Sequence, residues 1–228
     1  GGAEYWSGST VKDRIAGSLA MAAYAREVAK NYDVTIALHT DHCAKQNLDS
    51  WTEQLMHMEA EEVKAGRLPW FQSHMWDGSA IPLDENLEIA KRLLQLAVDS
   101  HTVLEIEVGA VGGEEDGVVG EINEKLYTST ADAIKTVEAL GLGEKGRYIT
   151  ALTFGNVHGA YKPGHVKLRP ELLGTIQEEV AAHYGLDHRP FDLVMHGGSG
   201  STDEEIALAV ANGVIKMNVD TDTQYAFT

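Results

Sequence analysis

Cysteine, basic residues and long apolar stretches are scarce in this chain of 228 residues. Its one cysteine, Cys43, excludes an internal disulfide and fits a reducing cytoplasm. Lysine and arginine number 18 against 35 acidic residues, and the net charge of −17 argues against a nucleic-acid partner. No apolar run reaches the roughly 18 residues of a membrane span. We therefore expect a cytoplasmic protein with neither nucleic acid nor membrane as a partner.

Strand-like and helix-like segments alternate along the chain, which predicts a parallel sheet. The expected strands cover 34–39, 70–77, 102–108, 147–154, 191–195 and 214–219. The expected helices cover 10–31, 47–65, 85–99, 130–140, 170–184 and 202–213, and a long loop is expected over 109–124. The predicted N-caps are Thr10, Asp84, Thr130 and Thr202, the last with Glu205 in a capping box.

Polar residues follow each of the six expected strands. No Gly-x-Gly-x-x-Gly turn joins a strand to a helix, so a dinucleotide fold is unsupported. A doubly wound sheet gathers its site at one switch point, whereas a (β/α)8 barrel builds it from many strand ends. We therefore predict an incomplete TIM barrel, an α/β fold in which residues 1–228 form a single partial domain with six of eight strands. The two other strands are expected before Gly1, so that the chain is a fragment cut at both ends.

Three histidines, His42, His158 and His196, stand at the ends of predicted strands. Three imidazoles from separate strands can hold a catalytic zinc ion that keeps one coordination position open. A single histidine is more often a structural hydrogen-bonding residue, so the hypothesis depends on the recurrence at three strand ends. His39 and His74 are candidates to support such ligands.

Acidic residues gather in two places. Glu105 and Glu107 lie two apart on one expected strand and therefore share a face. Inside a barrel, carboxylates are costly unless they are paired or bind a metal, and Asp77 at another strand end can join them. The segment 114–116, Glu-Glu-Asp, is flanked by glycines. It is either a solvated acidic loop or a mobile loop that carries a general base.

The segment 196–200, His-Gly-Gly-Ser-Gly, leads directly into the helix expected from 202. Glycines let the backbone approach a ligand, and the N–H groups at the start of a helix can bind an anion. Residues 218–221 follow the next strand, and phosphate sites in barrels are commonly built from the loops after strands 7 and 8. The alternative is a pair of tight turns that bind no ligand.

Together these motifs resemble the class II, metal-dependent fructose-1,6-bisphosphate aldolases, in the subclass with a long Gly-Gly-Glu-Glu-Asp-Gly loop. The matching stretches are 39–43, 73–77, 104–108, 112–117, 155–159 with 161–163, 196–201 and 216–224. The resemblance implies a lyase of glycolysis and gluconeogenesis that cleaves fructose 1,6-bisphosphate to dihydroxyacetone phosphate and glyceraldehyde 3-phosphate. Cleavage would pass through a metal-stabilised ene-diolate, in a homodimer or higher homo-oligomer.

The resemblance also implies roles for individual residues. His42, His158 and His196 would bind the catalytic zinc, and Asp77 and Glu107 a second metal. Asp41 would be the acid–base group at the aldehyde oxygen, and Glu115 would remove the proton that generates the ene-diolate. A monovalent cation is implied at the backbone of 157, 159 and 197. The dihydroxyacetone phosphate half of the substrate would contact Gly159, Gly197, Gly198, Ser199, Asn218, Val219, Asp220 and Thr221.

Other functions stay open on the sequence alone. Tagatose 1,6-bisphosphate is an alternative substrate, although the acidic loop favours fructose. A metal-dependent barrel hydrolase and an inactive fragment are two further alternatives. The family has a phosphate-binding serine in the part that would precede Gly1 and an arginine in a C-terminal segment, and neither is present in these 228 residues.

Overall fold

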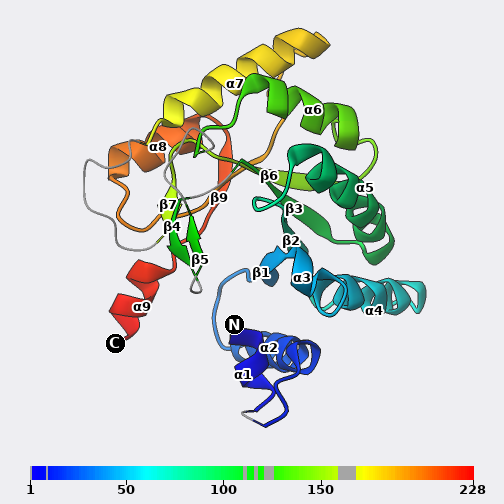
Figure 1. Ribbon diagram of the computed structural model, residues 1–228. Helices are drawn as coiled ribbons and strands as arrows, with labels where there is room; N and C mark the ends of the chain where they lie inside the picture. The colour runs from blue at the N-terminus through cyan, green and yellow to red at the C-terminus, as the bar shows by residue number, and fades with distance from the viewer. Residues whose placement is uncertain (1, 9, 110–111, 116–117, 121–125, 159–167) are drawn as a thin grey trace.

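The computed structural model describes residues 2–8, 10–109, 112–115, 118–120, 126–158 and 168–228, and side chains outside 110–125 and 157–167. Its centre is a six-stranded parallel sheet in the order β1-β2-β3-β6-β8-β9 (Figure 1). The strands are β1 His39–Ala44, β2 Ser73–Asp77, β3 Val103–Val108, β6 Tyr148–Leu152, β8 Leu193–Met195 and β9 Val214–Met217. This order follows the chain, as in a barrel, and the prediction of an incomplete TIM barrel is confirmed.

Helices connect successive strands and lie around the outside of the sheet (Figure 1). Neighbouring helices pack against one another in chain order from α4 to α8. The helices are α1 Gly2–Trp6, α2 Arg14–Ala29, α3 Lys45–Leu48, α4 Thr52–Lys64, α5 Leu83–Ser100, α6 Thr130–Leu140, α7 Pro170–Tyr184, α8 Asp203–Ala211 and α9 Thr221–Phe227. Among the described residues, no helix is long and apolar enough to span a membrane.

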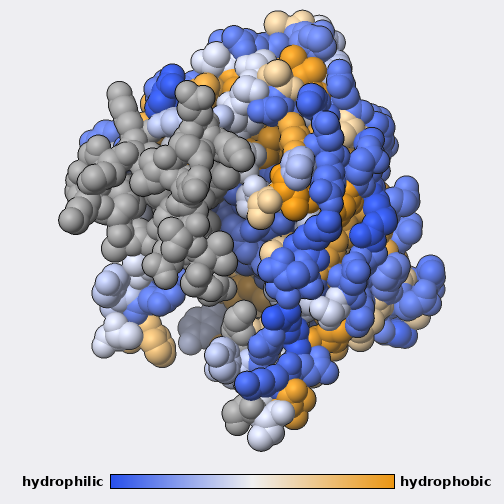
Figure 2. Space-filling model, viewed as in Figure 1, coloured by the Kyte–Doolittle hydropathy of each residue, from blue (hydrophilic) through white to orange (hydrophobic). Residues whose placement is uncertain are grey.

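The main hydrophobic core lies between the outer face of the sheet and these helices. Alternate residues of β3, namely Leu104, Ile106 and Val108, point into it and are at most 1% exposed. Because successive side chains of a strand alternate between faces, the residues between them, Glu105 and Glu107, point to the concave inner face. Figure 2 shows the result from outside, where hydrophilic residues cover most of the visible helices and hydrophobic ones lie between them.

The expected start of the first strand is wrong. The stretch 34–38 forms no strand, Val34 and Ile36 are exposed, and β1 begins at His39. Strand pairing starts where Gln72 N–H donates to the Leu38 carbonyl. The polar segment that was expected to follow a strand is therefore the strand itself. It forms an edge of the sheet next to β2, where no second neighbour supports the residues before it.

Three expected helix caps differ from the structure. The cap of α2 is Asp13 and not Thr10, and its carboxylate accepts the N–H groups of Ile15 and Ala16. The N-cap position of α5 is Pro82, with Asp84 in the first turn. In α6 the cap is Ser129, one residue before the expected Thr130, and it forms a capping box with Asp132. The capping box of Thr202 and Glu205 in α8 is confirmed.

Other helix and strand boundaries also differ from the predicted ones. The helix expected over 47–65 is divided into α3 and α4, since the backbone of Trp51 is not helical. The expected loop over 109–124 contains an antiparallel pair, β4 Gly112–Glu115 and β5 Val118–Gly120. With β7 Val157–His158 these strands form a second, three-stranded sheet in the order β5-β4-β7. The short helices α1 and α9 were not expected.

Candidate active site

A β-bulge in β1 brings Asp41 and His42 into the concave face of the sheet. In the pairing with β2, Thr40 is opposite His74 and Cys43 is opposite Trp76, so two residues of β1 face the single residue Met75. A bulge of this kind re-aims a side chain without ending the strand. Adjacent residues of a regular strand point to opposite faces, and the extra residue lets both Asp41 and His42 serve the same site.

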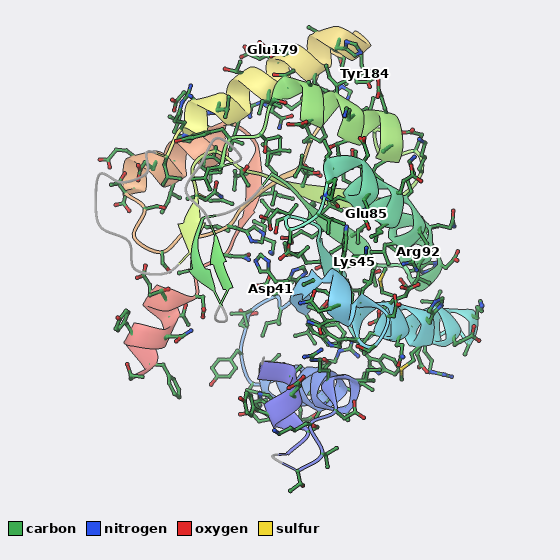
Figure 3. All side chains as sticks on the ribbon, viewed as in Figure 1. Asp41, Lys45, Glu85, Arg92, Glu179 and Tyr184 are labelled. Carbon is green, nitrogen blue, oxygen red and sulfur yellow. The ribbon has the colours of Figure 1, made fainter. Side chains whose placement is uncertain are left out.

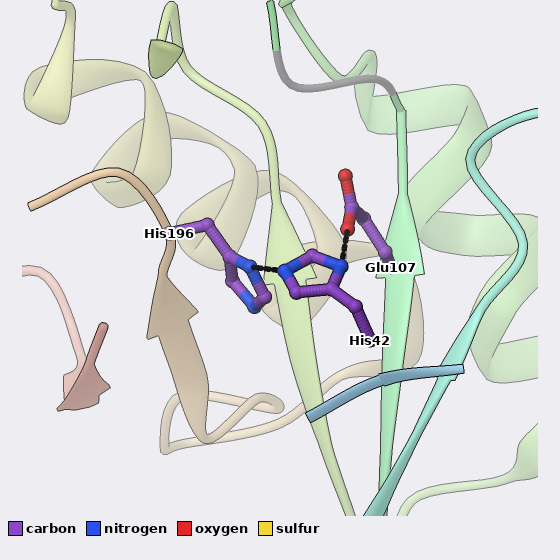
Figure 4. A group of neighbouring side chains, drawn as sticks. All are labelled: His42, Glu107 and His196. Carbon is purple, nitrogen blue, oxygen red and sulfur yellow. Dashed lines mark hydrogen bonds and ion pairs between the residues drawn. The ribbon is translucent and has the colours of Figure 1, made fainter. Parts of the chain in front are cut away.

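His42 meets His196 and Glu107 in one cluster (Figure 4). One potential ligand atom from each residue lies within 4.8 Å of the others. His42 Nε2 and His196 Nδ1 face each other at 2.8 Å, and the Glu107 carboxylate lies 3.9 Å from His42 Nδ1. The three residues come from β1, from the residue after β8 and from β3, so the sheet gathers them from distant parts of the chain.

Carboxylates hold the other nitrogen of each imidazole. His42 Nδ1 donates to Asp77 at 3.0 Å, and His196 Nε2 donates to Glu105 at 2.8 Å. The two facing nitrogens, His42 Nε2 and His196 Nδ1, share one proton in a hydrogen bond. A cation in place of this proton would face the lone pairs of both rings. Carboxylate–histidine–metal triads of this kind fix the tautomer of a ligating histidine. The donor set of imidazole and carboxylate is one that zinc accepts.

Asp77 lies at the end of β2, with its carboxylate on His42 and on the Ser79 N–H group. Burial alone raises the pKa of this carboxyl, but its interactions with His42 and Ser79 outweigh burial and hold the pKa at about 2. Asp77 is therefore ionised at neutral pH and well placed to orient His42. Its predicted part in a second metal site with Glu107 stays a prediction.

Two predicted residues, His158 and Glu115, lie in the small sheet, where the structure describes only their backbone. His158 pairs with Gly113, two residues before Glu115. The Asn156 amide donates to the His196 carbonyl at 3.0 Å, which ties this segment to the end of β8. The chain around His158 is thus anchored beside His196, a member of the cluster of His42, Glu107 and His196. The side chains of His158 and Glu115 lie outside the described part.

Asp41 is half-exposed at the edge of the same face, near the centre of the molecule in Figure 3. Asn218 Nδ2 donates to its carboxylate, at 3.2 Å and 3.4 Å to the two oxygens, and His39 Nε2 lies 3.6 Å away. Burial raises the pKa of this carboxyl, but His39 and the charges of His42, His196 and Lys216 lower the pKa far more, to well below its usual range. Asp41 is accordingly a carboxylate at neutral pH.

A second group of polar side chains lies on the same inner face, nearer the amino ends of the strands. Here Glu105, fully buried, is 3.4 Å from His39 Nε2 and 2.8 Å from Lys216 Nζ. Burial raises the pKa of Glu105, but the contacts with His196, His39 and Lys216 lower it below the usual range. His39, Asp41 and Glu105 also bring potential ligand atoms within 4.8 Å of one another. The sequence predicted the buried position of Glu105 but missed Lys216, whose signal was a lone cation within an expected strand.

His74, the other histidine considered for a supporting role, lies on the opposite face. Its Nε2 donates to Glu59 at 2.7 Å, and its Nδ1 accepts the Thr40 hydroxyl at 2.8 Å. His74 and Glu59 are both fully buried between β2 and α4. His39 therefore lies with the site residues and His74 does not.

The glycine-rich segment and the end of β9 lie together, as expected. Gly198 N–H donates to the Asn218 carbonyl, and Ser199 Oγ accepts the N–H of Asp222 at the start of α9. Gly197 has φ +62°, and a Cβ at Gly198 would lie 2.9 Å from that same carbonyl, so both positions require glycine. The remaining predicted contacts, Val219, Asp220 and Thr221, continue this segment, whereas Gly159 lies outside the described residues.

The fold and the candidate site together indicate a class of protein. A parallel α/β half-barrel carries two imidazoles and several carboxylates near the carboxyl ends of its strands, with a donor set suited to a metal ion. This is the architecture of a barrel enzyme whose site could hold a metal ion. Residues 5–228 match the family model described as fructose-bisphosphate aldolase class-II. The chain belongs to the class II fructose-bisphosphate aldolase family, whose members are lyases.

Individual relatives agree with the family model. A protein from Streptomyces coelicolor named fructose-bisphosphate aldolase is 60% identical over the whole chain, and one of the same name from Mycobacterium tuberculosis is 59% identical. A crystal structure of fructose-bisphosphate aldolase from Campylobacter jejuni superposes with a TM-score of 0.83 at 40% identity, over 99% of this chain and 63% of that one. The chain spans about two thirds of the length of the curated relatives it matches, at 67%.

Proposed function

We propose that the protein containing this chain is a zinc-dependent aldolase that reversibly cleaves fructose 1,6-bisphosphate to dihydroxyacetone phosphate and glyceraldehyde 3-phosphate. The observation that carries the proposal is the cluster of His42, Glu107 and His196 beside the Asp41 carboxylate, in a chain of this family. The relatives' name, fructose-bisphosphate aldolase, supports the same substrate.

The metal ligands in this proposal are His42, His196 and His158. A bound zinc ion supplies a Lewis acid that polarises the substrate carbonyl. Asp77 and Glu105 keep the imidazoles of His42 and His196 in the tautomers that bind a cation. A second divalent ion at Asp77 and Glu107, and a monovalent cation at the backbone of 157, 159 and 197, are further parts of the proposal.

Two carboxylates move the protons. In the cleavage direction Asp41, ionised at neutral pH, accepts the proton of the substrate hydroxyl that becomes the aldehyde oxygen. Glu115 returns a proton to the carbon that the broken bond leaves behind, and removes it again in the condensation direction. General acid–base catalysis of this kind contributes about 10²- to 10⁴-fold to the rate.

The phosphate of the dihydroxyacetone half is assigned to the ends of β8 and β9. The proposed contacts are Gly197, Gly198 and Ser199, together with residues 218–221 and Gly159. The Gly198 N–H group donates to the Asn218 carbonyl, so the proposed backbone donors are those of the other residues. Backbone donors suit an acidic protein, because they bind an anion without a basic surface. A homodimer or higher oligomer and a cytoplasmic location stay predictions.

The test uses the full-length protein, with cleavage of fructose 1,6-bisphosphate followed before and after chelation. We expect activity that chelation abolishes and zinc restores, at one or more zinc ions per chain. Activity that survives complete removal of metal contradicts the proposal. Comparison of kcat/KM for fructose and tagatose 1,6-bisphosphate decides between the epimers. Hydrolysis of esters or amides without aldol cleavage indicates the hydrolase, and no turnover with less than one zinc per chain indicates an inactive protein.

A further inference from the structure

We propose that Lys216 is a positioning residue for this reaction, which holds the amide of Asn218 toward Asp41 and the carboxylate of Glu105 toward His196. The inference rests on the proposed aldolase function and assigns a role to a side chain outside the predicted set of ligands, acid–base groups and substrate contacts. Through these two contacts, one ammonium group connects the proton-transfer side of the site with the metal side.

A shift in strand pairing places Lys216 opposite the inward-facing part of β8. Between β8 and β9, Leu193 pairs with Val214, but the next residue, Val194, pairs with Lys216. Ile215 is therefore an extra residue, and it is exposed, at 63%. A bulge re-aims the side chain that follows it, and here it brings Lys216 to the same layer as Glu105.

The ammonium group has two partners at short distance. Lys216 Nζ donates to Asn218 Oδ1 at 2.7 Å and lies 2.8 Å from Glu105 Oε2. An ammonium group can only donate hydrogen bonds, so it fixes the oxygen of the Asn218 amide on its own side. The NH₂ group of Asn218 must then point the other way, and it is this group that donates to both oxygens of Asp41.

On the metal side, Lys216 neutralises a charge that would otherwise be costly. Glu105 is fully buried, and its second oxygen accepts the His196 Nε2–H group at 2.8 Å. A buried carboxylate is tolerated when it is paired and strongly destabilising when its partner is removed. Lys216 thus holds the Glu105 carboxylate in place, and Glu105 in turn leaves His196 Nδ1 directed toward His42.

These contacts argue against a nucleophilic role for Lys216. A lysine that forms a Schiff base must lose its proton, which desolvation or a neighbouring cation favours. The Lys216 ammonium group is instead directed at a carboxylate oxygen of Glu105, at 2.8 Å, and at the amide oxygen of Asn218, at 2.7 Å. Its position is also defined by two side chains of the site, which fits a group that orients its neighbours.

The test compares Lys216→Met with a matched control, Lys135→Met, in the full-length zinc-loaded protein. Lys135 forms an ion pair with Asp84 on the outer surface, with both side chains at least half-exposed. We expect Lys216→Met to retain about one zinc ion per chain, to lower kcat for fructose 1,6-bisphosphate at least tenfold and to change KM less than threefold, on the scale seen when groups that orient ligands are removed. Lys135→Met should match the wild type in all three measurements.

A double-mutant cycle shows whether Lys216 acts through Asn218. If it does, Lys216→Met should lower kcat much less in an Asn218→Ala background than in the wild type. Lys216→Cys alkylated with 2-bromoethylamine restores an ammonium at the original distance and should recover most of the lost kcat. Cys43 is buried and should not compete for the reagent.

Three results would overturn the proposal: Lys216→Met as active as Lys135→Met, additive effects of the Lys216 and Asn218 changes, or no recovery after aminoethylation. If Lys216→Met fails to fold, Lys216→Ala takes its place in the same cycle, since it also removes the donor to Asn218. Wild-type protein is assayed alongside. An inactive wild type refutes the aldolase function itself. An active wild type whose kcat is unchanged by Lys216→Met refutes only the positioning role.

Discussion

A fully buried histidine contacts a fully buried glutamate on each face of the sheet. On the inner face His196 Nε2 lies 2.8 Å from Glu105, and on the outer face His74 Nε2 lies 2.7 Å from Glu59. Residue types, burial and distance are nearly the same in the two pairs. Nothing in these three properties distinguishes a site from a structural contact.

The two pairs differ in what their remaining atoms contact. The second oxygen of Glu59 accepts the Phe71 N–H group, and the second nitrogen of His74 accepts the Thr40 hydroxyl. The outer pair thus ends in neutral groups that belong to the fold. The second oxygen of Glu105 faces the Lys216 ammonium, and the second nitrogen of His196 faces His42. The inner pair ends in an ammonium group and in an imidazole that could bind a metal, and this contrast supports its assignment to the proposed site.

Removal of the metal should produce the largest loss of activity, and it should affect only the inner face of the sheet. Chelation of the full-length protein is expected to lower aldolase activity by at least about 10³-fold, because carbonyl polarisation by the metal contributes several kcal/mol. The hydrophobic core lies on the other face, so the far-ultraviolet circular dichroism spectrum should change little. Collapse of that spectrum together with activity would mean that the metal holds the fold as a whole.

Two adjacent residues of β1, Thr40 and Asp41, point to opposite faces of the sheet, and their variants should therefore have different effects. Asp41→Asn removes the proposed proton acceptor and should lower kcat by about 10²- to 10⁴-fold with zinc content unchanged. Its neighbour Thr40 faces the other way, so Thr40→Val should leave kcat intact and lower the free energy of unfolding by about 1–3 kcal/mol. Kinetics, zinc analysis and urea unfolding of both variants provide the comparison. Loss of zinc from Asp41→Asn would instead make Asp41 a metal ligand.

The β-bulge in β1 explains why the sequence predicts only in part which side chains point to the inner face of the sheet. Alternation along a regular strand assigns Glu105 and Glu107 correctly to one face. The same rule places Asp41 and His42 on opposite faces, and only the pairing with β2 reveals the extra residue between Thr40 and Cys43. The roles of Asp41 and His42 came from resemblance to a family, not from periodicity.

Order and type of the strands were predictable, but their ends were not. Five strands of the main sheet and the capping box of α8 follow from local patterns, whereas β1 spans 39–44 and not the expected 34–39. The stretch 34–38 is apolar enough for a strand yet lies outside one, since strand formation depends on a neighbour as well as on residue type. The contacts of Lys216 could not be predicted for a similar reason, because its partners Glu105 and Asn218 are brought to it by strand pairing and not by sequence spacing.

Glu59→Ala should disrupt the outer pair without touching the chemistry. It leaves His74 and the Phe71 N–H group buried without their acceptor, and loss of one partner of a buried pair typically costs about 3–5 kcal/mol. Urea unfolding of the full-length protein measures this loss. The kcat per folded, zinc-loaded molecule should stay within about twofold of the wild type. A tenfold lower kcat in fully folded protein would make the outer pair part of the active site.

Asp77→Asn should have the smallest of these effects, on metal affinity. The amide keeps the size of the carboxylate but accepts the His42 N–H group more weakly, and loss of such a supporting carboxylate typically lowers metal affinity by about 10- to 100-fold. Competition with a chelating dye measures the dissociation constant. If Asp77 is itself a ligand of a second metal, the variant will instead lose one of two ions and keep the affinity of the other.

The central claim is that His42, His158 and His196 bind a single metal ion on the inner face of the sheet. Diffraction data from crystals of the full-length, zinc-loaded protein, recorded on both sides of the zinc absorption edge, locate the ion directly. We predict an anomalous peak within about 2.0–2.1 Å of one nitrogen of each histidine. A peak at the neighbouring group of His39, Asp41 and Glu105, with none between His42 and His196, would contradict the account.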